Sequence, residues 1–166
     1  MGLIEIPIDC YPDNYGSWEV DMLRFIRNEC RHGFSHDNEF ITVAQHEDWW
    51  HKNCGSLVAA IYAVALRPAH NVSAVGYGLL RKDERSRWVS SVAVSPAWGG
   101  RGIGGEITDR IIRKASKVYA WARLDNPAAM ALHRTGDWRE THRDDRLVYY
   151  ETWDGICNQP IRRARV

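Results

Sequence analysis

The chain has 166 residues, of which 45% are hydrophobic and 26% are charged, a balance typical of a globular protein. This length suffices for one domain with a substantial core, so we expect residues 1–166 to form a single domain. With 22 basic and 21 acidic residues the formal net charge is +1, which argues against nucleic acid and anionic membranes as partners.

The cysteines and apolar runs exclude further classes. Cys10, Cys30, Cys54 and Cys157 form neither a C-x-x-C pair nor a short Cys/His cluster, so neither a metal site nor a disulfide framework is predicted. A cytoplasmic location is therefore expected. The first residues lack the basic and apolar segments of a signal peptide, and no apolar run reaches membrane-spanning length.

The first part of the chain is predicted to form a strand and two helices. Alternating isoleucines indicate a strand over 3–8. Ser17 is a typical N-cap for a helix with a broad apolar face. After a polar loop at 31–40, Thr42 and Gln45 have the spacing of a capping box at the start of a second, short helix.

Three strands are predicted next, at 57–66, 72–81 and 87–94, with no helix between them. The first is almost entirely apolar, as expected for a central strand buried on both faces. In the second, Gly76 and Gly78 reduce the side-chain volume available for packing.

A glycine-rich segment follows the third strand and its Pro96, and we expect it to bind phosphate. Apolar residues then recur every three or four positions from 103 to 118, which predicts a helix. The first helical turn has backbone N–H groups without internal partners, and glycines let a phosphate approach them closely. Arg101 adds a full positive charge. The glycines are Gly99, Gly100, Gly102, Gly104 and Gly105.

Three other interpretations of these glycines are possible in principle. A flexible turn would need fewer glycines, and a Walker loop would need a Gly-Lys-Ser/Thr ending that is absent. A dinucleotide fingerprint is formally present at Gly100, Gly102 and Gly105, with Asp125 near the expected acidic position. That fingerprint belongs to alternating strands and helices, whereas three strands in succession precede these glycines.

The rest of the chain completes an α+β fold, which is an α/β mixed sheet without an internal repeat. Strands are predicted at 118–123, 138–142 and 147–153, and a helix begins at Asn126. The basic tail at 160–166 is expected to be frayed.

Two motifs in order resemble those of the GNAT family of N-acetyltransferases. The first is Val92-Ala93-Val94, then Pro96, then the glycine segment from Gly99 to Gly104. The second is the segment from Asn126 to Trp138, which is similar to the family's N-x-x-A-x-x-L-Y-x-x-x-G-F pattern. The resemblance implies a GNAT fold, with a central mixed, mostly antiparallel sheet of six to seven strands flanked by about four helices.

The resemblance also implies acetyl-CoA as the cosubstrate, with no metal. The backbone of Val92, Ala93 and Val94 would pair with the pantetheine arm, and Asn126 would lie near the cofactor while also capping its helix. The remaining cofactor-binding residues implied are those of the loop and first helical turn: Gly100, Arg101, Gly102, Ile103, Gly104 and Gly105.

Catalysis in such an enzyme is a direct attack by an amine on the thioester, so the departing thiolate gains from a nearby acid. The family's usual acid is a tyrosine, and His133 stands at that position, where an imidazolium could donate to the sulfur at neutral pH. A core or surface histidine is the alternative. The base is open between a water chain and the 36–39 loop with His36 and Glu39.

Two further positions depart from the family pattern. Trp88 and Trp121 stand where many relatives keep a glutamate, and our hypothesis is that they wall the acceptor site. Gly99 replaces the Arg or Gln that begins the loop, which leaves Arg101 as its only charge.

These motifs predict an acetyl-CoA-dependent N-acetyltransferase acting on a primary amine of a small molecule, a sugar nucleotide or a protein N-terminus. One alternative is a family member that binds acyl-CoA with little catalysis and acts as a sensor or partner. A dinucleotide-binding protein is the alternative from another class. The sequence leaves open whether the protein forms a homodimer.

Overall fold

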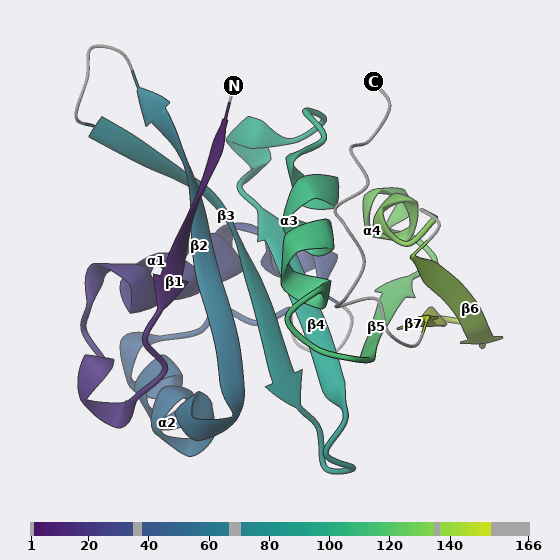
Figure 1. Ribbon diagram of the computed structural model, residues 1–166, viewed down its shortest axis with the longest axis horizontal. Coiled ribbons are helices and arrows are strands. Elements are labelled where there is room, and N and C mark those ends of the chain that lie inside the picture. Colours follow the sequence, from purple (N-terminus) through teal and green to yellow (C-terminus); the bar gives the residue numbers. More distant parts are fainter. Residues whose placement is uncertain (1, 35–37, 67–70, 135–136, 154–166) are drawn as a thin grey trace.

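The computed structural model describes residues 2–34, 38–66, 71–134 and 137–153 (Figure 1). Within these residues seven strands form one sheet in the order β1-β2-β3-β4-β5-β7-β6. All neighbouring strands are antiparallel except β4 and β5. This confirms the expected mixed, mostly antiparallel sheet. The strands are β1 Leu3–Ile8, β2 Leu57–Leu66, β3 Asn71–Lys82, β4 Trp88–Val94, β5 Val118–Arg123, β6 Trp138–Arg143 and β7 Leu147–Thr152.

Four α-helices accompany the sheet in the described part of the chain, and their predicted starts are confirmed. Ser17 Oγ accepts a hydrogen bond from the backbone N–H of Val20. At Thr42, the capping box is complete, since Thr42 Oγ1 accepts from Gln45 N at 3.2 Å and Thr42 N donates to Gln45 Oε1 at 2.9 Å. The helices are α1 Trp18–Glu29, α2 Val43–Asn53, α3 Ile103–Ile112 and α4 Pro127–Leu132. None of these has the length and hydropathy of a membrane-spanning helix.

Helix α3 is shorter than its apolar pattern predicts. The pattern extends to Val118, but the helix ends at Ile112 and Val118 is the first residue of β5. Ala115 and Val118 nevertheless join Ile111 in one buried cluster. The apolar spacing therefore identified the buried residues correctly, whereas the backbone has to leave the helix early to pair β5 with β4.

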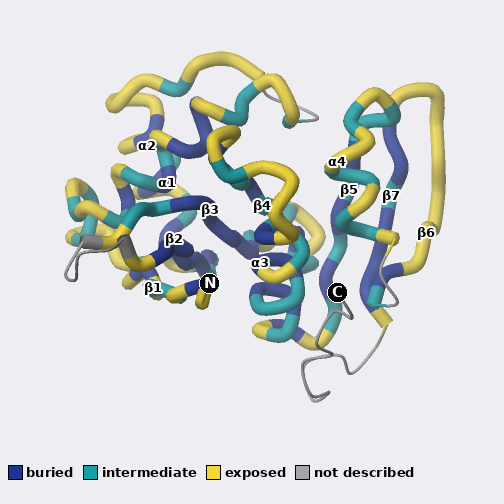
Figure 2. Tube along the Cα trace, turned by 90° about the horizontal axis from the view of Figure 1, so that it is seen from above, coloured by how far each residue is buried: buried dark blue, intermediate teal, exposed yellow. Residues whose placement is uncertain are grey.

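The helices cover opposite faces of the sheet, with α1 and α2 on one face and α3 on the other (Figure 1). On the first face, Leu23 and Ile26 of α1 pack with Tyr77 and Leu79 of β3. On the second face, the side chains of α3 pack with Leu80, Val75 and other strand residues in two further clusters. The tube in Figure 2 is buried along β2 and β3 and mostly exposed along the edge strand β6.

The two glycines of β3 have a packing role. A Cβ at Gly76 would lie 2.5 Å from the carbonyl oxygen of Ala93 and 2.7 Å from Ile107 Cδ1. At Gly78 it would lie 3.0 Å from Ile107 Cγ2 and 3.1 Å from Ile111 Cβ. These glycines therefore let α3 pack directly on the sheet, and so set the distance between the first turn of α3 and β4.

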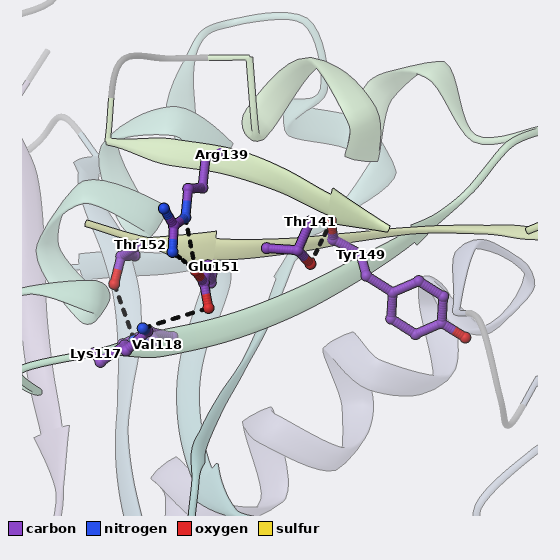
Figure 3. A network of polar contacts seen from close by, with 7 residues as sticks. All are labelled: Lys117, Val118, Arg139, Thr141, Tyr149, Glu151 and Thr152. Atoms are coloured by element: carbon purple, nitrogen blue, oxygen red, sulfur yellow. Dashed lines mark hydrogen bonds and ion pairs between the residues drawn. The ribbon is translucent and has the colours of Figure 1, made fainter. Parts of the chain in front are cut away.

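The β5-β7-β6 end of the sheet is held together by a polar network around Glu151 (Figure 3). Its carboxylate accepts hydrogen bonds from Arg139 and lies 3.4 Å from Lys117 Nζ. Burial alone would raise the pKa of Glu151, but these cations outweigh it and the pKa is lowered. Thr152 Oγ1 also accepts from the Val118 backbone N–H at 2.9 Å. The network thus joins β6 and the start of β5 to β7.

Candidate functional site

The two parallel strands at the middle of the sheet separate soon after they meet. Their ladder consists of Trp88 opposite Val118 and Val89 opposite Tyr119. On its other side β4 stays paired with β3 as far as Val94. Beyond Val89, the edge of β4 that faces β5 therefore has no ladder partner among the described strands, so its backbone groups are available to a ligand.

A cleft of about 1000 Å³ opens at this separation and contains most of the predicted cofactor-binding residues. Arg101 is the exception, because it does not line the cleft. Its guanidinium lies 4.8 Å from the ring centroid of Trp98, which does line the cleft. The carbonyl of Val94 also accepts a hydrogen bond from Cys30 Sγ. The predicted residues in the lining are Val92, Ala93, Val94, Gly100, Gly102, Ile103, Gly104, Gly105, Asn126 and His133.

The start of α3 presents backbone donors to the cleft. Gly100 and Gly102 have φ angles of +72° and +75°, a conformation that favours glycine. Gly102 is the N-cap, and no side chain caps the helix. The N–H groups of the first turn, together with the positive end of the helix dipole, therefore form a site suited to an anion such as phosphate.

Asn126 connects two parts of the cleft wall. Its Oδ1 accepts from the backbone N–H of Ala129 at 3.0 Å, so the predicted cap of α4 is confirmed. Its Nδ2 donates to the carbonyl of Gly33 at 3.0 Å. This second bond was not predicted, since it joins residues 93 positions apart. Asn126 therefore ties α4 to the segment after α1.

His133 lies at the end of α4 against two aromatic rings. It stacks on Tyr150 at 4.6 Å between centroids and meets the edge of Trp138 at 4.7 Å. Its Nδ1 is 2.8 Å from the carbonyl oxygen of Ala129, so Nδ1 carries the proton. Burial lowers its pKa to about 4, although the bond to Ala129 opposes this shift. At neutral pH the free protein therefore holds a neutral imidazole here, and not the imidazolium expected from the sequence.

The cleft continues onto the face of the sheet covered by α1 and α2. Cross-strand neighbours share a face, and Tyr77 Oη lies 3.3 Å from Ser91 Oγ on that face. Trp121 lines this part of the cleft as expected, but Trp88 does not, and it packs on the other face with Lys82 over its ring. Strand alternation puts them on opposite faces. The other residues lining this part include Arg27, Phe34, Glu39, Phe40, His46, Trp49 and Arg81.

His46 is a site residue that no motif or spacing in the sequence indicated. It is 2% exposed, and neither ring nitrogen has a hydrogen-bond partner. Its ring stacks on Trp49 at 5.5 Å. Burial, reinforced by Arg24, lowers its pKa to about 4, while Asp21 opposes the shift. Of the two residues proposed as base in the 36–39 loop, Glu39 lines the cleft and His36 lies outside the described residues.

Known structures with this fold are named for different acceptors. A phosphinothricin acetyltransferase from Sinorhizobium meliloti, in complex with acetyl-CoA, is 13% identical with a TM-score of 0.70, over 99% of this chain and 95% of that one. Spermidine N-acetyltransferase from Vibrio cholerae, with CoA and spermine, is 12% identical with a TM-score of 0.68, over 95% and 98%. A ribosomal-protein-alanine N-acetyltransferase from Brucella melitensis is 18% identical with a TM-score of 0.63, over 92% and 99%.

A comparison with curated proteins gives no match. Comparison with family profiles matches the acetyltransferase (GNAT) family over residues 1–136, which includes the separated strands, the glycine loop and α4. Together with the fold and the cleft, this match settles the family. The chain belongs to the acetyltransferase (GNAT) family.

Proposed function

We propose that this protein is an acetyl-CoA-dependent N-acetyltransferase that acetylates a primary amine by direct attack in a ternary complex. The observation that carries the proposal is one cleft that joins the free edge of β4 to the uncapped start of α3. Such a cleft suits a long ligand with an amide-bearing arm and a pyrophosphate. The complexes of two structural neighbours with acetyl-CoA or CoA support this choice of ligand.

In this proposal the pantetheine arm pairs with the backbone of Val92, Ala93 and Val94, and the pyrophosphate meets the amides of the 100–105 segment. Arg101 lies over Trp98 and adds positive charge beside that segment. Asn126 positions α4 along the cleft. A backbone N–H near Val92 stabilises the oxyanion that forms when the amine attacks the thioester carbonyl.

We assign to His133 the proton taken up by the leaving thiolate. Nδ1–H is held by Ala129, and Nε2 has no hydrogen-bond partner among the described residues. An adjacent thiolate favours the charged imidazolium, which raises the pKa of His133 from its value of about 4 in the free protein. The attacking amine supplies the proton, because it loses one N–H hydrogen when it becomes an amide. This proton passes through Nε2 to the thiolate, which leaves as the CoA thiol, and His133 returns to its neutral form.

His133→Ala is expected to lower kcat at least tenfold, because general acids contribute about 100-fold or more. His133→Tyr, which restores the family's usual acid, is expected to retain more activity than His133→Ala. The exposed His142 provides the control His142→Ala. Steady-state rates of CoA release measure this effect. A loss of less than tenfold in His133→Ala would rule out His133 as the proton donor to the thiolate.

Gly105→Ala is expected to raise the Kd for acetyl-CoA about tenfold without loss of stability. An added Cβ at Gly105 has no atom within 4 Å, and alanine is preferred over glycine in a helix by about 1 kcal/mol. The methyl group would occupy the cleft where the pyrophosphate approaches the helix. Gly55→Ala is a matched control, since its Cβ is equally unobstructed and Gly55 does not line the cleft. Unchanged affinity in Gly105→Ala would contradict the binding mode.

Calorimetric titration with acetyl-CoA, CoA and NAD tests the function as a whole, followed by a screen of primary amines for CoA release. Micromolar binding of acetyl-CoA with turnover of an amine is the expected result. Binding of acetyl-CoA without turnover of any amine would favour the alternative of an acyl-CoA sensor. Two observations agree with that alternative: Trp121 stands at a family glutamate position, and His133 is neutral. Binding of NAD alone would reject the proposal.

A further inference from the structure

The acceptor half of the cleft has aromatic walls. Phe34, Phe40, Trp49 and Trp121 all line it, on the face of the sheet covered by α1 and α2. Phe40 is 57% exposed, so this wall is open to an incoming molecule. Aromatic surfaces of this kind favour an acceptor with an apolar or planar body.

The charges in this half of the cleft are predominantly positive. Among the described residues of the lining, Arg27 and Arg81 carry positive charge and Glu39 is the single carboxylate. The Arg27 guanidinium lies 4.1 Å from the ring centroid of Phe34. A polyamine would bring further cations beside Arg81, whereas an acceptor with an anionic group would neutralise it.

Arg81 is the cation available to such a group. Its side chain is half-buried and lines the cleft, and it makes no hydrogen bond, ion pair or ring contact with the described residues. The guanidinium presents a planar fork of donors that matches a carboxylate. Its position on β3 is opposite Val89 of β4, at the end of the cleft away from the glycine loop.

The distance along the sheet suits a small acceptor. Val92, where the thioester carbonyl would lie, is three residues from Val89, or about 10 Å along the strand. In the inferred complex the long side chain of Arg81 reaches along the cleft toward Val92 and so shortens the gap that the acceptor has to bridge. A molecule in which amine and carboxylate lie close together therefore fits between the two positions, with its side chain against the aromatic wall.

We infer that the acceptor is a free amino acid with an apolar side chain, whose carboxylate binds Arg81. This inference rests on the proposed function and specifies its substrate class. It predicts that the carboxylate, and not the amine alone, determines which acceptors are used. It also separates this protein from its neighbour named for spermidine.

The test measures acetylation of L-phenylalanine, L-leucine, L-phenylalaninamide and spermidine by the wild-type protein, Arg81→Gln and Arg81→Lys. The control is Arg85→Gln, which lies exposed in the turn between β3 and β4. We expect the wild type to prefer phenylalanine over its amide at least tenfold in kcat/KM, in line with a charge-assisted hydrogen-bond pair. Arg81→Gln should abolish that preference, Arg81→Lys should keep part of it, and Arg85→Gln should keep all of it.

Equal use of the amide or of spermidine by the wild type would overturn the inference and leave the acetyltransferase proposal standing, as would a preference that survives Arg81→Gln. If acetyl-CoA binds but no amine is acetylated, the proposed function fails. The inference about Arg81 is then tested by measuring the binding of acetylated products. In that case N-acetylphenylalanine and its amide are titrated into the CoA complex. A preference for the acid that Arg81→Gln removes supports the carboxylate site, and equal binding rejects it.

Discussion

Acidification from pH 7 to pH 5 is expected to lower the free energy of unfolding by about 4 kcal/mol, mostly through His46 and His133. Burial lowers the pKa of His46 and of His133 to about 4 in the folded protein. An unfolded chain returns both to about 6.5, so the unfolded state binds more protons as the pH falls through 6.5. Stability therefore decreases with acidification, by about 2 kcal/mol for each histidine at pH 5.

Urea denaturation at the two pH values measures this effect. The double variant His46→Leu with His133→Phe is expected to lose most of the dependence above pH 5, because neither replacement titrates. His51→Gln, at an exposed position on the same helix α2, is the control. A double variant as acid-sensitive as the wild type between pH 7 and 5 would show that other groups are responsible.

Carboxylates such as Asp144 also have lowered pKa values and also destabilise the fold on acidification, but they act in a lower pH range. Backbone N–H groups of Arg146 and Leu147 lower the pKa of Asp144, and the unfolded chain returns it to about 4. Such a group stabilises the folded state above its unfolded pKa, and this contribution is lost as the pH falls through the folded pKa. The interval from pH 7 to 5 therefore lies above the titration of Asp144 and reports mainly on the histidines.

Ile107→Ala is expected to destabilise the protein by about 2–5 kcal/mol, the range for truncation of a buried isoleucine. Ile107 is fully buried, and its side chain lies over the two glycines of β3, Gly76 and Gly78. Neither glycine has a side chain that could fill the cavity, so little relaxation is available there. For a chain of this length the melting temperature should fall by about 2–4 °C per kcal/mol.

The control for Ile107→Ala is Ile4→Ala, at a position that is 40% exposed in β1. It removes the same atoms but leaves no closed cavity, so its effect on the urea midpoint should be much smaller. Equal losses in the two variants would mean that α3 is not held by close packing on the glycines. Acetyl-CoA titration of the folded Ile107→Ala protein would then show how far the helix start depends on that contact.

Local signals in the sequence were sufficient to predict most of the strands and the helix starts of this protein. Most strands of the sheet follow from runs of apolar or alternating residues, although β6 is polar after Trp138. The starts of α1 and α2 follow from Ser17 and Thr42 as caps. The glycine loop was also recognisable, since its positive φ angles need glycine and its neighbours on both sides have regular patterns. These features depend only on residues close together in the chain.

The protonation state of His133 could not be predicted from its position in a motif. Its pKa follows from burial against Tyr150 and Trp138, which belong to strands at the far end of the sheet. The same holds for Asn126, whose cap of α4 is local but whose bond to Gly33 is not. Motif spacing therefore placed these residues in the cleft, while long-range packing set their chemistry.

By itself the sequence determined the order of strands and helices, the phosphate-type loop and the family motifs, because backbone propensities, caps and apolar periods act over a few residues. The tertiary structure alone decided where β4 and β5 separate, that Trp121 rather than Trp88 lines the cleft, and that His46 and Arg81 belong to it. Those properties depend on strand register and on which face of the sheet each helix covers, so they arise only when distant segments pack together.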